Sequence, residues 1–143
     1  MFGRPDYREI EHTADVGVEL QARDLPSALE SAAAAMFDVI CDVESVERRL
    51  TIPLTVDARE GDLENLLVRW LTELLYVHQS RNVVLSGFEV LSVSRGTLEA
   101  RVSGEELDPE RHTIKLEIKA PTYHELLLEE REGRWSVRVI FDT

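Results

Sequence analysis

The sequence DLENLLVRWLTELLYVHQ, residues 62–79, carries the strongest helix pattern in the chain. Its apolar residues recur three and four positions apart and so share one helical face: Leu63, Leu66, Leu67, Trp70, Leu71, Leu74 and Leu75. Gly61 interrupts the preceding pattern, and the Asp62 carboxylate can accept hydrogen bonds from the free N–H groups of a first turn. The stretch therefore predicts an amphipathic helix that ends near His78 or Gln79.

A second helix is predicted from about Leu25 to Ile40. Asp24 can cap it, and Pro26 fits its first turn, where a missing N–H costs no hydrogen bond. The apolar residues again fall on one face: Leu25, Ala28, Leu29, Ala32, Met36, Val39 and Ile40. The two predicted helices are separated by stretches of a different kind.

Those other stretches alternate apolar and polar residues, as half-buried strands do. The alternation covers residues 16–22, 50–56, 88–92, 98–102, 114–120, 123–128 and 135–141. A turn at Arg95-Gly96 joins two of them into a hairpin, and Pro53 indicates an edge position because proline has no N–H to donate. We expect one domain over residues 1–143, an α+β two-layer sandwich with a mostly antiparallel sheet and both main helices on one face.

Composition narrows the class of protein. A chain of 143 residues with 43% hydrophobic content can bury one core, and its formal charge of −12 repels the phosphates of nucleic acids, so no direct RNA or DNA binding is expected. No apolar run approaches the ~20 residues of a membrane span. Cys41 is the single cysteine, and the first residues lack a secretory signal pattern. A soluble protein of the reducing cytoplasm is expected.

Oxygen-bearing residues gather near both ends of the chain. The motif EHTAD, residues 11–15, lies between two strand-like segments, and the sequence FDT occupies residues 141–143. Hard cations such as Ca²⁺ or Mg²⁺ prefer several oxygen ligands, which Asp15, Asp142 and the main chain of Thr143 can offer. Each lies at the end of a predicted strand, but the pattern alone does not bring them together. A lone aspartate in such a place is more often a turn residue.

Histidines give weaker signals. His12 can be a metal ligand, a proton donor or a residue that orients Asp15, and the structural role is favoured. His124-Glu125 lacks the second histidine of a zinc-binding helix. No glycine-rich phosphate loop is present, and no residue other than the candidate ligands suggests a nucleophile or general base.

A further group of charged residues follows the predicted hairpin. Residues 104–112 are polar and interrupted by glycine and proline, so an exposed loop is expected there. Glu117 and Lys119 share one strand face and can form a polar patch with Arg111 and His112. A charged outer sheet face is the usual explanation of such a pattern.

Five segments taken together closely resemble the archease family. They are HTADVG at 12–17, AMFDV at 35–39, LLVRWLTELLY at 66–76, KAPTYH at 119–124 and VIFDT at 139–143. The resemblance covers nearly the whole chain, and its specificity comes from the ordered set. It implies a small α+β protein that acts with the GTP-dependent RNA-splicing ligase of tRNA halves, promoting guanylylation and repeated turnover. Such proteins are accessory factors of tRNA splicing and not enzymes.

The resemblance also assigns residues. The family's divalent-metal site, usually described with calcium, matches Asp15, Asp142 and Thr143 here; Mg²⁺ and Mn²⁺ suit the same oxygens. Residues that contribute to ligase activation match Glu117 with its neighbour Lys119, and Arg111. His12 is also expected to take part in partner activation, in a supporting role to Asp15.

Two departures from the family pattern concern its site. The chain has Thr143 where isoleucine is common, and Pro121 where valine or isoleucine is usual, which puts the local strand hydrogen bonds in question. The alternative function is a chaperone-like modulator of RNA-modifying enzymes such as tRNA methyltransferases. A free-standing metal-dependent hydrolase is the weakest hypothesis.

Overall fold

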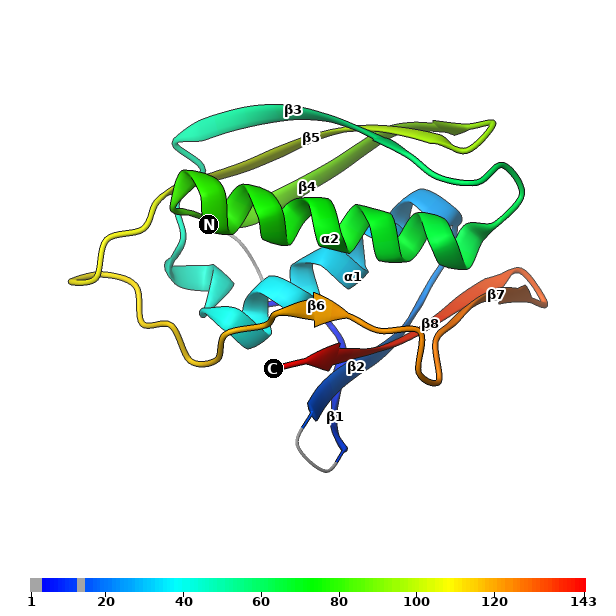
Figure 1. Cartoon of the computed structure of the whole chain (residues 1–143), viewed down its shortest axis with the longest axis horizontal. Coiled ribbons are helices and arrows are strands. Elements are labelled where there is room, and N and C mark those ends of the chain that lie inside the picture. The colour runs from blue at the N-terminus through cyan, green and yellow to red at the C-terminus, as the bar shows by residue number, and fades with distance from the viewer. Residues whose placement is uncertain (1–3, 13–14) are drawn as a thin grey trace.

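Two helices and two antiparallel sheets make up the computed structural model, which describes residues 4–12 and 15–143. The α+β class expected from the sequence is confirmed. Figure 1 shows the helices lying between the sheets, and each helix contacts strands of both. Both helices therefore cover the inner face of each sheet, and the outer sheet faces turn away from them.

The helices begin where the sequence predicts. Helix α1 spans Leu25–Ile40, with the Asp24 carboxylate accepting from the N–H of Ser27 at 2.8 Å. Helix α2 spans Leu63–Arg81, two or three residues longer than expected, because the left-handed backbone of Asn82 (φ 53°) ends it only there.

The larger sheet joins the two ends of the chain. Its strand order is β1-β2-β8-β6, and β7 also pairs with β8. The strands are β1 (Arg8–His12), β2 (Asp15–Ala22), β6 (Ala120–Pro121), β7 (Leu127–Arg131) and β8 (Arg134–Asp142). Strand β8 is thus an interior strand, with β2 along one edge and β6 and β7 along the other.

The smaller sheet has the order β3-β5-β4, with β3 at Leu50–Asp57, β4 at Val83–Ser94 and β5 at Thr97–Glu106. Arg95 (φ 52°) and Gly96 (φ 80°) form the predicted hairpin turn, since positive φ at both positions matches the strand twist. Pro53 lies on the edge strand β3, as its missing N–H requires.

Two predicted strands are shorter than their alternation suggests. Within 114–120 only Ala120 belongs to a strand, although Ile114 makes an isolated bridge to Cys41. The segment is extended, and its apolar side chains point toward the core. No strand of the described chain runs alongside it closely enough to form a ladder of backbone hydrogen bonds. The prediction for 123–128 is also wrong at its start, because residues 123–125 turn and β7 begins at Leu127.

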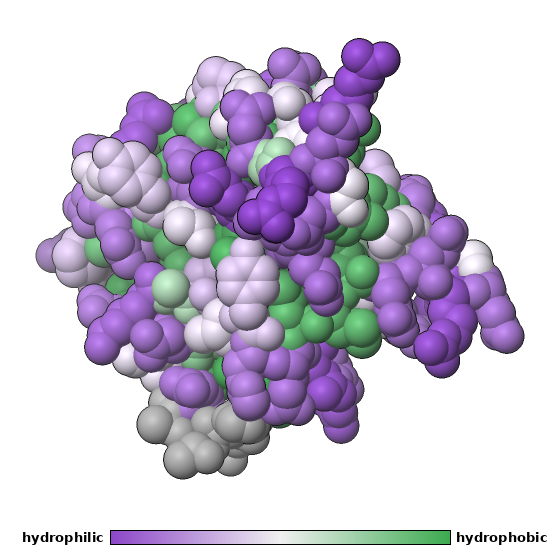
Figure 2. Space-filling model, turned by 45° about the vertical axis from the view of Figure 1, so that its right-hand side comes forward, coloured by the Kyte–Doolittle hydropathy of each residue, from purple (hydrophilic) through white to green (hydrophobic). Residues whose placement is uncertain are grey.

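Charged and polar residues dominate the surface. Figure 2 shows hydrophilic residues over most of one face, with smaller apolar patches between them. In the part of the chain that the structure describes, the large exposed apolar side chains are Tyr76, Leu91 and Tyr123. No described helix combines the length and the apolar character that crossing a membrane requires.

Trp70 joins the two helices in the centre of the core, so its removal tests the packing. The fully buried indole donates its Nε1–H to the carbonyl of Leu29 on α1 at 2.9 Å. We expect Trp70→Ala to lower the free energy of unfolding by about 3–5 kcal/mol, through the lost burial and the cavity it leaves. The measurement is urea unfolding followed by circular dichroism. Trp135→Ala, at a half-buried position, should cost clearly less; equal losses would contradict this account.

Candidate functional site

The pairing of β2 with β8 makes Asp15 and Asp142 neighbours. The two strands are antiparallel, and their register has Val16 opposite Phe141. Asp15 directly precedes Val16, and Asp142 directly follows Phe141, so both aspartates stand at the same end of this ladder. Val16 and Phe141 are the last paired residues of this ladder, so the two aspartates stand one position beyond it.

Both aspartates face away from the helices. Val16 and Phe141 are buried in the core, and side chains alternate between the two faces of a strand. Asp15, which is half-buried, and Asp142, which is exposed, therefore share the outer face of the larger sheet. Gly17 keeps the strands close here, because a Cβ atom at this position would stand only 2.7 Å from the carbonyl oxygen of Val139.

The opposite edge of β8 is bound by β6 and its flanking residues. The N–H of Lys119 donates to the carbonyl of Asp142 at 2.8 Å, and the N–H of Thr122 donates to the carbonyl of Ile140 at 2.9 Å. Because Thr122 donates toward β8, an N–H at Pro121 would point away from that strand. The proline therefore removes no hydrogen bond from the ladder, which answers the question that its presence raised.

The donor chemistry at this strand end suits a hard divalent cation. Carboxylate and main-chain oxygens, which Asp15, Asp142 and Thr143 carry, are the kind of ligand that Ca²⁺ prefers. Among the described side chains, those of residues 4–10 and 15–143, no three His, Cys, Asp or Glu residues come together as a metal-binding group. A cation between Asp15 and Asp142 would therefore need main-chain or water oxygens to complete its coordination.

The other predicted site residues are placed differently. His12 ends β1 and pairs in register with Asp15, but its side chain and residues 13–14 of the motif lie outside the described part. Glu117 and Lys119 are exposed on the extended segment that leads into β6. In the described chain, neither side chain is hydrogen-bonded to Arg111 or His112. The polar patch considered for these four residues therefore stays a prediction.

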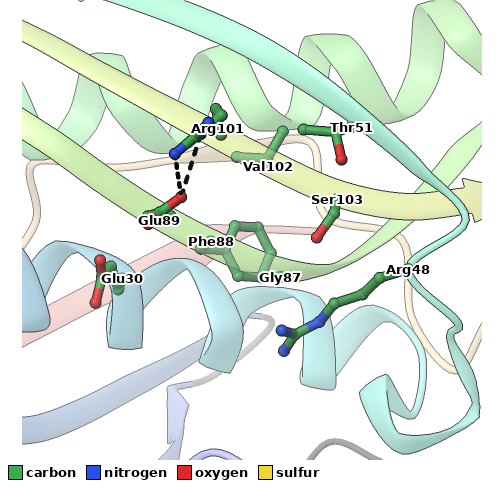
Figure 3. Close-up of a pocket in the computed structure, with 9 residues that line it drawn as sticks. All are labelled: Glu30, Arg48, Thr51, Gly87, Phe88, Glu89, Arg101, Val102 and Ser103. Atoms are coloured by element: carbon green, nitrogen blue, oxygen red, sulfur yellow. Dashed lines mark hydrogen bonds and ion pairs between the residues drawn. The ribbon is translucent and has the colours of Figure 1, made fainter.

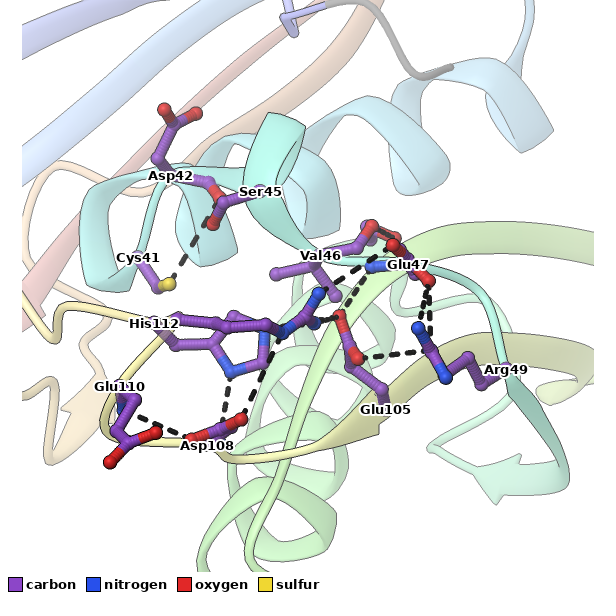
Figure 4. A network of polar contacts seen from close by, with 12 residues as sticks. Cys41, Asp42, Ser45, Val46, Glu47, Arg49, Glu105, Asp108, Glu110 and His112 are labelled. Atoms are coloured by element: carbon purple, nitrogen blue, oxygen red, sulfur yellow. Dashed lines mark hydrogen bonds and ion pairs between the residues drawn. The ribbon is translucent and has the colours of Figure 1, made fainter.

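Arg111 and His112 belong instead to a network around Glu105, shown in Figure 4. The expectation of an exposed loop at 104–112 is wrong in part, because Glu105 lies one residue before the end of β5 with its side chain only 7% exposed and His112 is fully buried. The Glu105 carboxylate accepts hydrogen bonds from the N–H of Glu47 at 2.6 Å, from the Arg111 guanidinium and from His112 Nε2 at 3.0 Å. The polar composition of 104–112 did not indicate this burial. The Glu105 and His112 side chains become buried only because residues 46–49 lie beside β5 in the folded chain.

The hydrogen bonds determine the tautomer of His112. The N–H of Asp108 donates to His112 Nδ1 at 2.9 Å, so Nδ1 carries no proton. Nε2 therefore carries the proton and donates it to Glu105. The 3.2 Å approach of the Arg111 guanidinium to Nε2 is then a contact between two donors and no hydrogen bond. The network is complete with a neutral imidazole and an ionised carboxylate.

The environment of Glu105 favours its charged form. Burial alone would raise the pKa of this carboxyl, but the hydrogen bonds from Glu47, Arg111 and His112 outweigh burial and hold the pKa below the ordinary glutamate value. The carboxylate thus contributes stability above the pKa of an unfolded glutamate, and that contribution is lost as the pH falls through the lower, folded pKa.

A separate hollow of about 510 Å³ lies beside the edge strand β4 (Figure 3). It exists because Gly87 has no side chain: a Cβ atom there would stand 2.1 Å from Ser103 Oγ and 2.8 Å from Arg48 Nε. Arg48 Nη2 donates to the carbonyl of Ser86 at 3.2 Å, and Glu30 Oε2 accepts from the N–H of Val90 at 2.8 Å.

These bonds give the charged residues of the hollow a structural role. Glu30 and Arg48 bind backbone groups of β4, and charged side chains on a sheet edge discourage pairing with another chain. Glu89 and Arg101, the other two charged residues of the lining, pair with each other at 3.1 Å. The charged side chains of the hollow bind backbone groups or one another, so the aspartate pair remains the stronger candidate site.

Comparison with known proteins agrees with this fold. The family model described as Archease protein family (MTH1598/TM1083) matches residues 7–143. An archease of Pyrococcus abyssi is 39% identical over 140 residues, which cover 95% of this chain and 97% of that protein. An archease of Sulfolobus acidocaldarius is 35% identical over 134 residues, covering 93% and 95%. The chain belongs to the archease family.

Solved structures of similar proteins include the following two. The solution structure of Methanobacterium thermoautotrophicum protein 1598 aligns with a TM-score of 0.78 at 32% identity, covering 96% of this chain and 98% of the other. The crystal structure of a Thermotoga maritima archease, described as a possible chaperone, aligns with a TM-score of 0.60 at 19% identity, covering 95% and 96%. The second likeness shows the shared fold alone.

The Glu105 network generates a prediction about pH. We expect Glu105→Gln to lower the free energy of unfolding at pH 7 by about 1–3 kcal/mol, because the neutral amide loses the charge-assisted bonds with Arg111. The difference from the wild type should begin to shrink as the pH falls below roughly 4.3, the ordinary glutamate pKa, and should disappear below the lower pKa of the folded protein. Denaturant unfolding between pH 3 and 7 measures it. Glu106→Gln, an exposed neighbour, is the control, and an equal effect there would contradict the assignment.

Proposed function

We propose that this protein is a metal-binding accessory factor of tRNA splicing that activates the GTP-dependent RNA ligase, promoting its guanylylation and repeated turnover. One observation supports the metal site above others: the β2–β8 register makes Asp15 and Asp142 neighbours on one open sheet face. In this proposal they hold a divalent cation, with Ca²⁺ favoured and Mg²⁺ or Mn²⁺ compatible, together with a main-chain oxygen of Thr143.

The open position of the two aspartates supports a role in a complex. They lie on the outer face of the larger sheet, so a partner can approach them without displacing a helix. Exposed Glu117 and Lys119 stand on the segment that binds Asp142 through the N–H of Lys119, close enough to touch the same partner. Arg111 supports this segment through Glu105. The formal charge of −12 complements a basic ligase surface and disfavours direct contact with RNA.

The alternative, a chaperone-like modulator of RNA-modifying enzymes, has the description of the Thermotoga maritima relative in its favour. In that case the protein suppresses aggregation of its partner, and neither aspartate matters. The two functions therefore predict different behaviour for the same variants.

Cation binding is the first test of the site. We expect a Ca²⁺ concentration 100 times the Kd to raise the free energy of unfolding by about 2.7 kcal/mol, or the midpoint of thermal unfolding by roughly 5–10 °C. Asp15→Asn and Asp142→Asn should abolish the shift, since each removes a charged ligand. Calorimetric titration with Ca²⁺, Mg²⁺ and Mn²⁺ ranks the metals. Asp6→Asn, an exposed position away from both strand ends, should respond like the wild type, and a shift retained by both site variants would rule the site out.

Ligase turnover is the second test. Adding the wild-type protein to a ligase stalled after one round should restore guanylylation and multiple turnover, measured with radiolabelled GTP and a cleaved tRNA. Asp15→Asn and Asp142→Asn should stimulate at least tenfold less, about the effect of losing 1.4 kcal/mol of interaction. Full stimulation by both variants removes the cation from the mechanism. No stimulation by the wild type, with protection of the ligase from aggregation, would favour the chaperone-like function.

A further inference from the structure

The end of β8 is bound by an unusual combination of contacts. Along one edge the ladder with β2 reaches Phe141. Along the other edge β6 has only two residues, Ala120 and Pro121. So short a strand gives few backbone hydrogen bonds, and the last residues of a strand open easily when few bonds bind them.

Thr122 supplies an additional bond at this place. Its hydroxyl donates to the carbonyl of Ile140 at 2.8 Å, and its own N–H donates to the same oxygen at 2.9 Å. Two donors from one residue fix the orientation of the Ile140 peptide group. The side chain of Ile140 points to the same sheet face as that of Asp142, two residues later, and is itself buried.

We propose that Thr122 is a positioning residue of the cation site. Its hydroxyl holds the end of β8 in place, and so holds Asp142 beside Asp15. This inference rests on the metal site of the proposed function and adds to it a residue that would not touch the cation.

The physical consequence concerns the fraction of molecules that are ready to bind. Without the hydroxyl, the end of β8 separates from its neighbours for a larger share of the time, so a smaller fraction of molecules can bind the cation. The apparent Kd for the cation rises by the same factor by which that fraction falls. A net hydrogen bond of ordinary strength corresponds to roughly a twofold to tenfold change in that fraction.

Three variants separate positioning from general stability. Thr122→Val keeps the β-branched shape and removes only the hydroxyl, while Thr122→Ser keeps the hydroxyl. Thr97→Val is a matched control, because the Thr97 hydroxyl donates to Asp57 at the same length of 2.8 Å in the other sheet. Each protein is studied well below its unfolding midpoint, by Ca²⁺ titration and by hydrogen exchange of the amides of residues 141–143 without metal.

We expect Thr122→Val to weaken Ca²⁺ binding roughly twofold to tenfold and to speed exchange at residues 141–143 by a similar factor. Thr122→Ser and Thr97→Val should match the wild type in both. Wild-type affinity in Thr122→Val overturns the inference and leaves the cation site standing. If the wild type binds none of the three cations, the proposed metal site fails and the positioning role at that site fails with it; faster exchange in Thr122→Val then shows only that the hydroxyl holds the end of β8.

Discussion

The antiparallel pairing of β2 with β8 is the constraint on which the rest of the structure depends. It joins residues near the beginning of the chain to residues near its end and makes β8 an interior strand. The inward side chains Val18, Val139 and Phe141 are buried beneath the helices. The same register that buries these residues leaves Asp15 and Asp142 together outside, so core packing and site geometry follow from one pairing.

A second set of long-range contacts holds the segment between β5 and β6. Its beginning is bound through Glu105, whose carboxylate reaches Glu47, Arg111 and His112. Its end is bound through the N–H of Lys119 to Asp142. No regular ladder holds 113–119, so its course is determined by these bound ends and by the N–H of Lys115, which donates to the carbonyl of Ile40 at 2.7 Å. The buried charge is stable because every described buried side-chain oxygen and nitrogen has a hydrogen-bond partner.

Rigid elements support the candidate site on both sides. Side chains on strands that are hydrogen-bonded into a sheet are positioned more precisely than side chains on loops. Here β2 and β6 are hydrogen-bonded to the two edges of β8. Gly17 permits the close approach on one edge, and Thr122 adds a side-chain bond on the other. The edge strand β4 differs from β8 because side chains, those of Glu30 and Arg48, form hydrogen bonds with its backbone groups.

The sequence by itself determined the local elements, because helix caps, apolar spacing and turn residues act over a few positions. Both helices, the Arg95-Gly96 hairpin and the edge position of Pro53 were predictable for that reason, and family resemblance named the aspartates. Only the tertiary structure decided which strands pair. Register across more than a hundred residues depends on how side chains fill a shared core, which no local pattern records. That is why it alone made Asp15 and Asp142 neighbours, buried Glu105 and His112, and left 113–119 without a ladder.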